Sequence, residues 1–330
     1  MSAVALRRRR AAGAGAGMKN FDEMLRIVEA HPLRKVAVAV AQDGPVIQAM
    51  AEARRRNIAE AVLVGDADAI AAEAGKAGVD LAGMEVVHQA DPLAAVAEAT
   101  RLVSSGQADI LMKGFVHTDD FLRGVLNKDY GLRSGSIMSH VFVAELGDPD
   151  RLMFITDGAM NIAPDLETKA CILLNAVYLA EIFGLTEPKV AVLTAVELVN
   201  PTMPATLEAA ALAAMGRRRQ FVPAAVVDGP LALDDAVSIR AAEHKKITGP
   251  VAGGADILLV PDIETGNILA KSLVYFGSRR LVGLLVGAKA PVVLTSRADS
   301  AEVKLLSVAA AVLMVNVSRT RQLKIGKVRY

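Results

Sequence analysis

The stretch Pro291-Val292-Val293-Leu294-Thr295-Ser296-Arg297-Ala298-Asp299-Ser300-Ala301-Glu302 decides the fold. Its apolar start, 292–294, is typical of a short buried strand. Asp299 and Glu302 are three residues apart, which is the spacing of a capping box, so a helix that runs to Val315 is predicted to begin here. The stretch therefore predicts a strand that leads directly into a helix.

Ser296 and Arg297 lie between that strand end and that helix start. A helix N-terminus favours anions, because its free N–H groups and its dipole both attract negative charge. The planar guanidinium of Arg297 also matches the oxygens of a phosphate group. We interpret the turn as a phosphate-binding corner. The alternative is that Arg297 is a surface residue beside an ordinary helix cap.

Outward from this stretch, apolar runs and helical spacing alternate along the chain. Strands are expected at 35–40, 61–66, 84–87, 108–114, 139–144, 152–156, 189–193 and 256–260. Helices are expected at 21–30, 46–56, 67–75, 92–106, 119–126, 166–183, 204–216 and 268–276, with turns at 148–150 and 228–230. This alternation predicts an α/β fold with a parallel sheet, whose ligands bind at the carboxyl ends of the strands.

Composition excludes several classes of protein. The 330 residues carry a net charge of only +1 and include no Trp, which argues against a nucleic-acid partner. The single cysteine, Cys171, excludes an intrachain disulfide and a multi-cysteine metal site, and we expect no metal at all. No apolar run appears as long as a membrane span of roughly 18 residues. We expect a cytoplasmic protein without a membrane partner.

Residues 1–17 differ from the rest of the chain. Four arginines at 7–10 are followed by a repeat of Ala and Gly, and Met18 comes next. These residues cannot bury a core, so a disordered extension upstream of a start at Met18 is expected. The alternative is a transit peptide.

Further polar residues lie at the predicted strand ends and turns. His117 and His140 adjoin strands near the expected cleft, where each either contacts a substrate or makes an ordinary hydrogen bond. Asn161 and Asn267 lie at turns between strands and helices, where helix capping is the alternative role.

In their order along the chain, these motifs resemble the phosphate acetyl/butyryltransferase family. The matching set is Lys113-Gly114, His117-Thr118, Ser139-His140, Asp157-Gly158, Asn161, Asp228-Gly229-Pro230, Pro261 to Asn267, Lys271 and Ser296-Arg297. Three further segments resemble the butyryl branch: 195–201, 244–245 and 287–289. The resemblance extends from about Met18 to about Val315.

The resemblance implies a two-domain α/β/α fold of the isocitrate/isopropylmalate dehydrogenase-like type. Residues 18–144 and 296–330 would form the first α/β domain, and residues 145–295 would form a second α/β domain inserted into it. The C-terminal helix would return to the first domain, which would bring Ser296 and Arg297 to the cleft.

The resemblance also implies a reaction: reversible transfer of a short acyl group, butyryl or acetyl, between CoA and inorganic phosphate to give acyl phosphate. Phosphate is itself a nucleophile, so the enzyme needs only to hold it against the thioester carbonyl. No cofactor is expected beside these two substrates, acyl-CoA and phosphate. A homodimer or larger homo-oligomer is expected.

Four residues are predicted to be catalytic, namely Ser296, Arg297, Glu302 and Asp157, with Asp299 as an alternative to Glu302. Arg297 would anchor phosphate, and Ser296 would donate a hydrogen bond to the oxyanion or the departing sulfur. The family's catalytic acid follows the Ser-Arg pair closely, so Glu302 and Asp299 are candidates for the base that deprotonates the CoA thiol, with Asp157 as a rival.

The predicted substrate-binding residues are Lys113, His117, His140, Asn161, Asn267 and Lys271. Lys271 would pair with the phosphate groups of CoA; the alternative is an ordinary lysine on a helix surface.

Three alternative functions stay open. The first is a phosphate acetyltransferase proper. The second is an NAD-dependent dehydrogenase of related fold, which would usually need a divalent metal held by aspartates, and the sequence has no clustered aspartate triad. The third is a non-catalytic binding protein, against which the intact Ser296-Arg297 pair argues.

Overall fold

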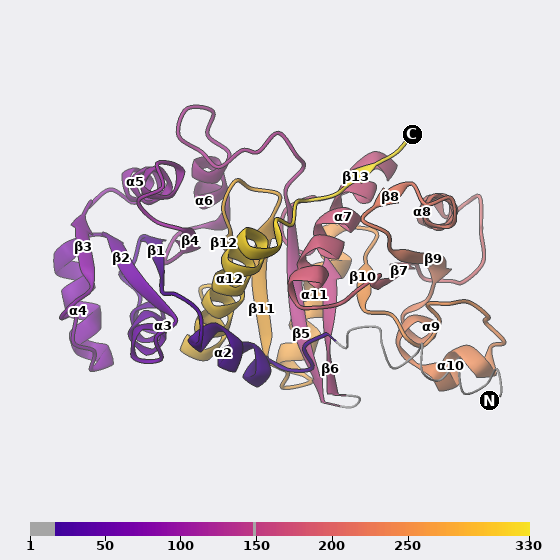
Figure 1. Ribbon diagram of the computed structural model, residues 1–330, viewed down its shortest axis with the longest axis horizontal. Coiled ribbons are helices and arrows are strands. Elements are labelled where there is room, and N and C mark those ends of the chain that lie inside the picture. The colour runs from indigo at the N-terminus through magenta and orange to yellow at the C-terminus, as the bar shows by residue number, and fades with distance from the viewer. Residues whose placement is uncertain (1–16, 148–149) are drawn as a thin grey trace.

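The computed structural model describes residues 17–147 and 150–330, and within them eleven strands form one sheet (Figure 1). The sheet order is β3-β2-β1-β4-β12-β11-β5-β6-β10-β7-β9. The predicted extension lies outside the described residues apart from Gly17, as does most of the predicted turn at 148–150. The α/β class is confirmed.

The strands of this sheet are β1 (Arg34–Ala39), β2 (Ala59–Gly65), β3 (Glu85–His88), β4 (Ile110–Lys113), β5 (Ser139–Gly147), β6 (Asp150–Thr156), β7 (Lys189–Leu193), β9 (Val226–Leu231), β10 (Ile257–Leu259), β11 (Leu281–Val286) and β12 (Val292–Val293). Two further strands, β8 (Phe221–Val222) and β13 (Lys327–Val328), pair with each other. The helices are α2 (Phe21–Glu29), α3 (Gly44–Arg55), α4 (Ala67–Ala77), α5 (Pro92–Ser104), α6 (Thr118–Val125), α7 (Leu166–Ile182), α8 (Pro204–Arg217), α9 (Leu233–Val237), α10 (Ile239–His244), α11 (Ile263–Tyr275) and α12 (Ala301–Arg321).

The sheet is parallel at both ends and antiparallel in the middle. Strands β3, β2, β1, β4 and β12 run in one direction. The pairs β12–β11, β11–β5 and β5–β6 are each antiparallel, and β6, β10, β7 and β9 are parallel again. Three reversals leave the two ends of the sheet running in opposite directions. The predicted parallel sheet is therefore confirmed for the outer strands and wrong for the centre.

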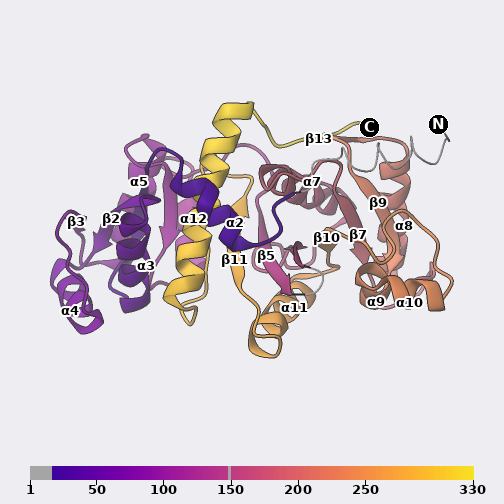
Figure 2. The same ribbon diagram turned by 60° about the horizontal axis from the view of Figure 1, so that its bottom comes forward.

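Helices cover both faces of the sheet. Buried residues of α2, α3, α7 and α12 pack on one face, and those of α5 and α6 pack on the other face of the first half. Helix α12 contacts α2, α3, α7 and β11, and Figure 2 shows it lying across the middle of the molecule beside α2 and α3. The C-terminal helix thus packs with the N-terminal part of the chain. The division into two domains stays a prediction.

Helix α12 corrects the expectation that no segment reaches the length of a membrane span. Its 21 residues are long and apolar enough by composition, with a mean hydropathy of 1.6 in the best window. In the structure, 72% of that window is buried, so α12 is a helix of the protein core.

Some predicted boundaries are wrong for identifiable reasons. The run 228–230, expected as a turn, continues strand β9, which pairs with β7 through a register shift. Helix α11 begins at Ile263, five residues earlier than expected, because the side chain of Asp262 accepts a hydrogen bond from the Thr265 N–H and caps it. Strand β11, whose six residues are all buried, has no counterpart in the sequence prediction.

The chain is crowded where β1 and β4 end side by side. The N–H of Phe115 donates to the carbonyl of Val40 at 2.8 Å, which draws the two strand ends together. A Cβ added at Gly114 would lie 2.2 Å from the same carbonyl oxygen, so only glycine fits here. This close approach positions Lys113 at the edge where the functional site lies.

Gly114→Ala is expected to lower the free energy of unfolding by about 1–3 kcal/mol, because the new methyl group would force the two strand ends apart. Gly75→Ala is the matched control: no atom lies within 4 Å of its added Cβ. Alanine in that helix should stabilise the protein by about 0.5–1 kcal/mol. Urea unfolding of both variants would measure the two changes. An unchanged free energy of unfolding in Gly114→Ala would show that the neighbouring backbone moves to accommodate the methyl group.

Candidate functional site

A cavity of about 190 Å³ lies beside Ser296, over the centre of the sheet. We call it the Ser296 cavity. Its polar lining residues are Thr118, His140, Asn267, Lys271, Thr295, Ser296 and Asp299. Its apolar lining residues are Phe142, Ala159, Val274, Tyr275, Leu281 and Leu294. The structure therefore brings together four of the predicted site residues, His140, Asn267, Lys271 and Ser296, from three separate segments.

The turn that carries Ser296 is held by a buried lysine that the sequence analysis missed. The ammonium group of Lys304 donates hydrogen bonds to the carbonyl of Ser296 at 3.0 Å and to that of Asp299 at 2.8 Å. Lys304 is only 1% exposed, and burial lowers its pKa. The only signal in the sequence is one lysine within the apolar run of this helix, which is also how an ordinary surface residue appears.

The carboxylate of Asp299 closes the same turn from within. Its Oδ2 accepts a hydrogen bond from the Ser296 N–H at 2.7 Å. The helix instead begins after Ser300, whose hydroxyl accepts from the Val303 N–H. The predicted capping box of Asp299 and Glu302 is therefore wrong, because Asp299 is used on the turn and Ser300 is the cap.

Glu302 lies outside the cavity. Its side chain is 62% exposed and its carboxylate is 3.7 Å from the guanidinium of Arg280. Among the two acids that follow the Ser-Arg pair, Asp299 lines the cavity and Glu302 does not.

Three cations gather next to this turn. Lys113, 2% exposed, donates from its ammonium group to the carbonyls of Gly114 and Val116. Burial first, and then the nearby positive charges of Arg297 and Lys304, lower the pKa of Lys113 to about 8. We call Lys113, Arg297 and Lys304 the cationic corner. An anion bound here would relieve the repulsion among these charges.

Arg297 is the exposed member of the cationic corner. Its guanidinium lies 5.8 Å from the centre of the Phe115 ring. Within residues 17–147 and 150–330 it makes no hydrogen bond and no ion pair with a carboxylate. Its five N–H donors are thus available to a ligand.

The floor of the cavity contains two buried polar atoms without a partner in the described part of the chain. His140 is fully buried, and its Nε2 lies 3.1 Å from the carbonyl of Leu294, which leaves Nδ1 unpaired. Because a carbonyl can only accept, Nε2 carries the proton. Burial lowers the pKa of His140, so the ring is neutral. The hydroxyl of Thr295 is likewise unpaired. Such atoms are costly to bury and mark a place where a ligand can supply the partner.

Asp157 and Asn161 hold the turn after β6 rather than line the cavity. The carboxylate of Asp157 accepts from the backbone N–H groups of residues 159–161 and from the Asn161 amide. The same Asn161 amide donates to the carbonyl of Met138. Asn267 lines the cavity and also donates to the carbonyl of Gly158 at 3.0 Å. Asp157 and Asn161 thus support the backbone, while Asn267 and, one turn later on α11, the exposed Lys271 line the cavity.

His117 is exposed and stands at the N-cap position of α6 without a capping hydrogen bond from its side chain. Its neighbour Thr118 is the residue that lines the cavity. The predicted segment therefore reaches the Ser296 cavity, but through Thr118 rather than through His117.

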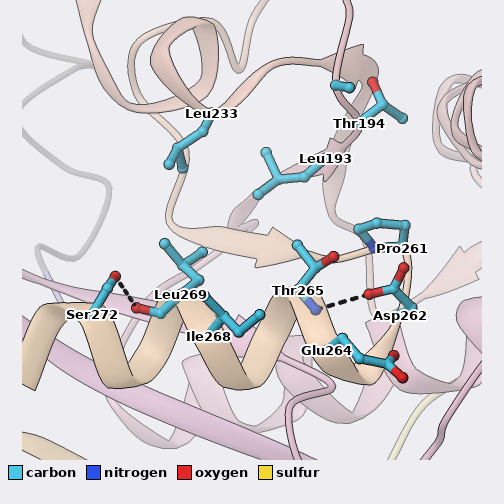
Figure 3. Close-up of a pocket in the computed structure, with 11 residues that line it drawn as sticks. Leu193, Thr194, Leu233, Pro261, Asp262, Glu264, Thr265, Ile268, Leu269 and Ser272 are labelled. Carbon is cyan, nitrogen blue, oxygen red and sulfur yellow. Dashed lines mark hydrogen bonds between the residues drawn. The ribbon is translucent and has the colours of Figure 1, made fainter.

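A larger hollow of about 870 Å³ is lined by other residues of α11 (Figure 3). Its lining includes Thr265, Ile268 and Leu269, all on α11, and Leu193 at the end of β7. Two acids, Asp262 and Glu264, line it, and none of its lining residues is basic. The larger hollow therefore suits a phosphate group less well than the cationic corner does.

The described residues contain no group of three His, Cys, Asp or Glu side chains arranged to hold a metal ion. The polar groups of the site can bind an anion, donate hydrogen bonds and accept a proton.

Comparison with known proteins places this geometry in a family. The model of the family described as "Phosphate acetyl/butaryl transferase" matches residues 92–312. The chain is 52% identical over 296 residues to a phosphate butyryltransferase from Clostridium beijerinckii, covering 90% of this chain and 98% of that relative. It is 44% identical over 276 residues to a phosphate acetyltransferase from Thermotoga maritima, covering 84% and 93%. The crystal structure of a branched-chain phosphotransacylase from Enterococcus faecalis matches with a TM-score of 0.76 and 37% identity, covering 86% of this chain and 99% of that one.

Lys113 makes the stability of the fold depend on pH. Its folded pKa of about 8 lies below the ordinary value of 10.5, so the unfolded chain binds the proton more tightly. Stability should therefore rise as pH increases from about 8 to 10.5, by on the order of 3 kcal/mol. Lys113→Met removes this titration. Urea unfolding from pH 7 to 10.5 should show the wild type gaining stability relative to the variant, and a constant difference would contradict the assignment.

Proposed function

The chain belongs to the phosphate acetyl/butyryltransferase family, and from that membership we propose that Ser296, Arg297 and Asp299 carry out its reaction at the Ser296 cavity. The reaction is reversible transfer of a short acyl group between CoA and inorganic phosphate, which gives acyl phosphate. The protein is an acyltransferase. Our proposal concerns the residues that carry out this reaction.

Arg297 anchors the phosphate. The observation that carries this assignment is an exposed guanidinium, without a carboxylate partner in the described residues, beside the buried positive charges of Lys113 and Lys304. A phosphate dianion complements this charge, and the guanidinium fork can bind two of its oxygens at once. A phosphate ion bound to Arg297 would lie next to Ser296, at the edge of the Ser296 cavity.

Ser296 stabilises the charge that develops during the reaction. A phosphate oxygen attacks the carbonyl carbon of the thioester, and the C–S bond breaks as CoA departs. The Oγ of Ser296 accepts a hydrogen bond from the Ala298 N–H at 3.3 Å, so its own proton remains available for donation. Donation to the oxyanion or to the departing sulfur lowers the barrier, because the charge on those atoms grows in the transition state.

Asp299 is the proposed base for the reverse direction, in which the CoA thiol must lose its proton. It lines the cavity beside Ser296, while Glu302 points to Arg280 at the surface and Asp157 is occupied by four hydrogen bonds. These contacts favour Asp299 over the other two carboxylates.

The remaining contacts concern CoA and the acyl group. Lys271 is exposed at the cavity rim, where its ammonium can pair with a phosphate of CoA. Asn267 and His140 line the cavity and are proposed to contact the substrate. Asn161 instead supports the turn that carries Asp157, and His117 stays a candidate contact on the rim segment.

We extend the proposal to properties that the family suggests. A butyryl-type substrate is supported by the higher identity to the butyryltransferase than to the acetyltransferase, 52% against 44%. A two-domain fold of the isocitrate/isopropylmalate dehydrogenase-like type, a homodimer, a cytoplasmic location and independence of cofactors are proposed with it.

Arg297→Ala should cripple turnover and leave the fold intact. Loss of a charge-assisted hydrogen bond to phosphate costs about 1.5–3 kcal/mol, which is roughly a 10- to 150-fold loss of kcat/KM for phosphate. Arg297→Lys should recover part of it, since the charge remains but the two-pronged geometry is lost. The measurement is phosphate-dependent release of the CoA thiol from butyryl-CoA, without NAD.

Arg218→Ala, at an exposed arginine in the second half of the chain, is the matched control and should keep the wild-type rate. Circular dichroism checks the fold of each variant. A folded Arg297→Ala protein with normal phosphate kinetics would show that Arg297 is an ordinary surface residue. A wild type that releases no thiol with phosphate would overturn the proposed function itself.

Lys304→Met tests the support of the turn. Methionine fills the same buried space but cannot donate to the carbonyls of Ser296 and Asp299, so the turn loses two charge-assisted bonds. We expect at least a tenfold loss of kcat from a protein that still folds. Lys76→Met, at a lysine whose side chain is 73% exposed, is the control. An unchanged rate in Lys304→Met would mean that other contacts hold the turn.

A further inference from the structure

Six apolar residues line the Ser296 cavity beside the buried polar groups of His140 and Thr295. Among the lining residues, Ser296 and Lys271 are exposed, while Leu281 and Leu294 are buried. Its volume of about 190 Å³ is below the range of about 300–1,000 Å³ that is typical of sites for drug-sized ligands. The cavity is too small for a whole CoA molecule and suits a short apolar group.

We propose that this cavity holds the acyl chain of the substrate and that Phe142 and Val274 set the chain length that the enzyme accepts. The inference rests on the proposed function, because it takes phosphate at Arg297 and the reacting carbonyl at Ser296. From that carbonyl the chain extends either into solvent or into the cavity. Burial between apolar side chains favours the cavity.

The unpaired hydroxyl of Thr295 adds a polar contact within the cavity, next to Ser296. It is buried in the lining and adjacent in sequence to Ser296, so it can donate to the carbonyl oxygen of the thioester. This contact would place the carbonyl at the Thr295–Ser296 side of the cavity. The chain would then point toward the β5 and α11 side, where Phe142 and Val274 are found.

Phe142 is held rigidly on β5. Its ring packs edge to face on His140 with the ring centres 4.3 Å apart. A Cβ added at Gly158 would lie 2.7 Å from the Phe142 ring, so the ring is also packed against the Gly158 backbone. Gly283 lies directly opposite Phe142 on β11, and a Cβ added there would lie only 3.0 Å from the His140 ring on which Phe142 packs. Phe142 therefore forms a fixed wall of the cavity.

Val274 lines the Ser296 cavity from α11, and other residues of the same helix line the larger hollow. Ile268, for example, lines that hollow and is 68% exposed (Figure 3). The larger hollow is also apolar, so it is the competing location for the acyl chain. Helix α11 thus offers one residue for substitution in each lining: Val274 in the Ser296 cavity and Ile268 in the larger hollow.

The test compares kcat/KM for acetyl-, butyryl- and hexanoyl-CoA with inorganic phosphate as acceptor. Phe142→Leu should enlarge the cavity and raise the hexanoyl-to-butyryl ratio at least tenfold. Val274→Phe should fill it and raise the acetyl-to-butyryl ratio at least tenfold. One methylene in an apolar pocket changes discrimination by about 10- to 200-fold. Ile268→Phe, which introduces the same ring among the residues that line the larger hollow, should leave both ratios within twofold.

The outcomes are distinct. Shifted ratios in the two cavity variants alone support the proposal. A shift in Ile268→Phe without one in Val274→Phe places the chain in the larger hollow and overturns the proposal. Unchanged ratios in folded, active variants overturn it as well. A wild type without phosphate-dependent thiol release would defeat the proposed function instead, so the two failures can be told apart. Thermal unfolding of each variant monitors the fold, and Phe142→Leu with Val274→Phe provides two independent changes of opposite sign.

Discussion

The buried ammonium group of Lys304 is the interaction on which the site depends. It is fixed by helix α12, which is itself fixed by packing against α2, α3 and β11, and it reaches the carbonyls of Ser296 and Asp299. The position of the Ser296 turn is thereby tied to the packing of the core. A charge without partners at this depth would be very costly, so these two carbonyls and the nearby carboxylates of Asp43 and Asp299 are what make it tolerable.

The electrostatics of the site follow from the same crowding. Three cations lie together, and the two acids near them do not fully offset the charge: Asp43 is half-buried, and burial raises its pKa. His140 contributes no charge, since burial keeps its imidazole neutral. The surplus positive charge is exposed only at Arg297. This charge would attract a phosphate ion to Arg297, next to Ser296, as the proposed function requires.

Much of the fold could be predicted from the sequence, because local signals decide it. The helices expected at 67–75 and 92–106 begin where predicted, after the capping residues Asp66 and Asp91, and the runs at 61–66 and 84–87 before them form strands. Strand β11 escaped prediction because its unbroken apolar run has no alternation, and one of its two antiparallel partners, β5, lies more than a hundred residues away. For the candidate site, the motifs identified several segments that the structure brings to one cavity. Which side chain of each segment faces the cavity depends on how the strands are paired, as the contrast between His117 and Thr118 shows. The sequence could not decide between Asp299 and Glu302 as the base, because both residues fit a capping box. The structure shows that Ser300 caps the helix instead.

The reversal of direction within the sheet has a consequence for how such an active centre can arise. Strands β4 and β12 reach the site from one half, and α11 and the turn after β6 reach it from the other, where the strands run the opposite way. The cavity is shared between them across β5 and β11. Neither half by itself retains a usable part of the reaction centre: one would keep the cations without the α11 wall, and the other would keep that wall without the cations. The proposed site thus requires both halves, and a gene fragment that encodes only one half would lack part of it.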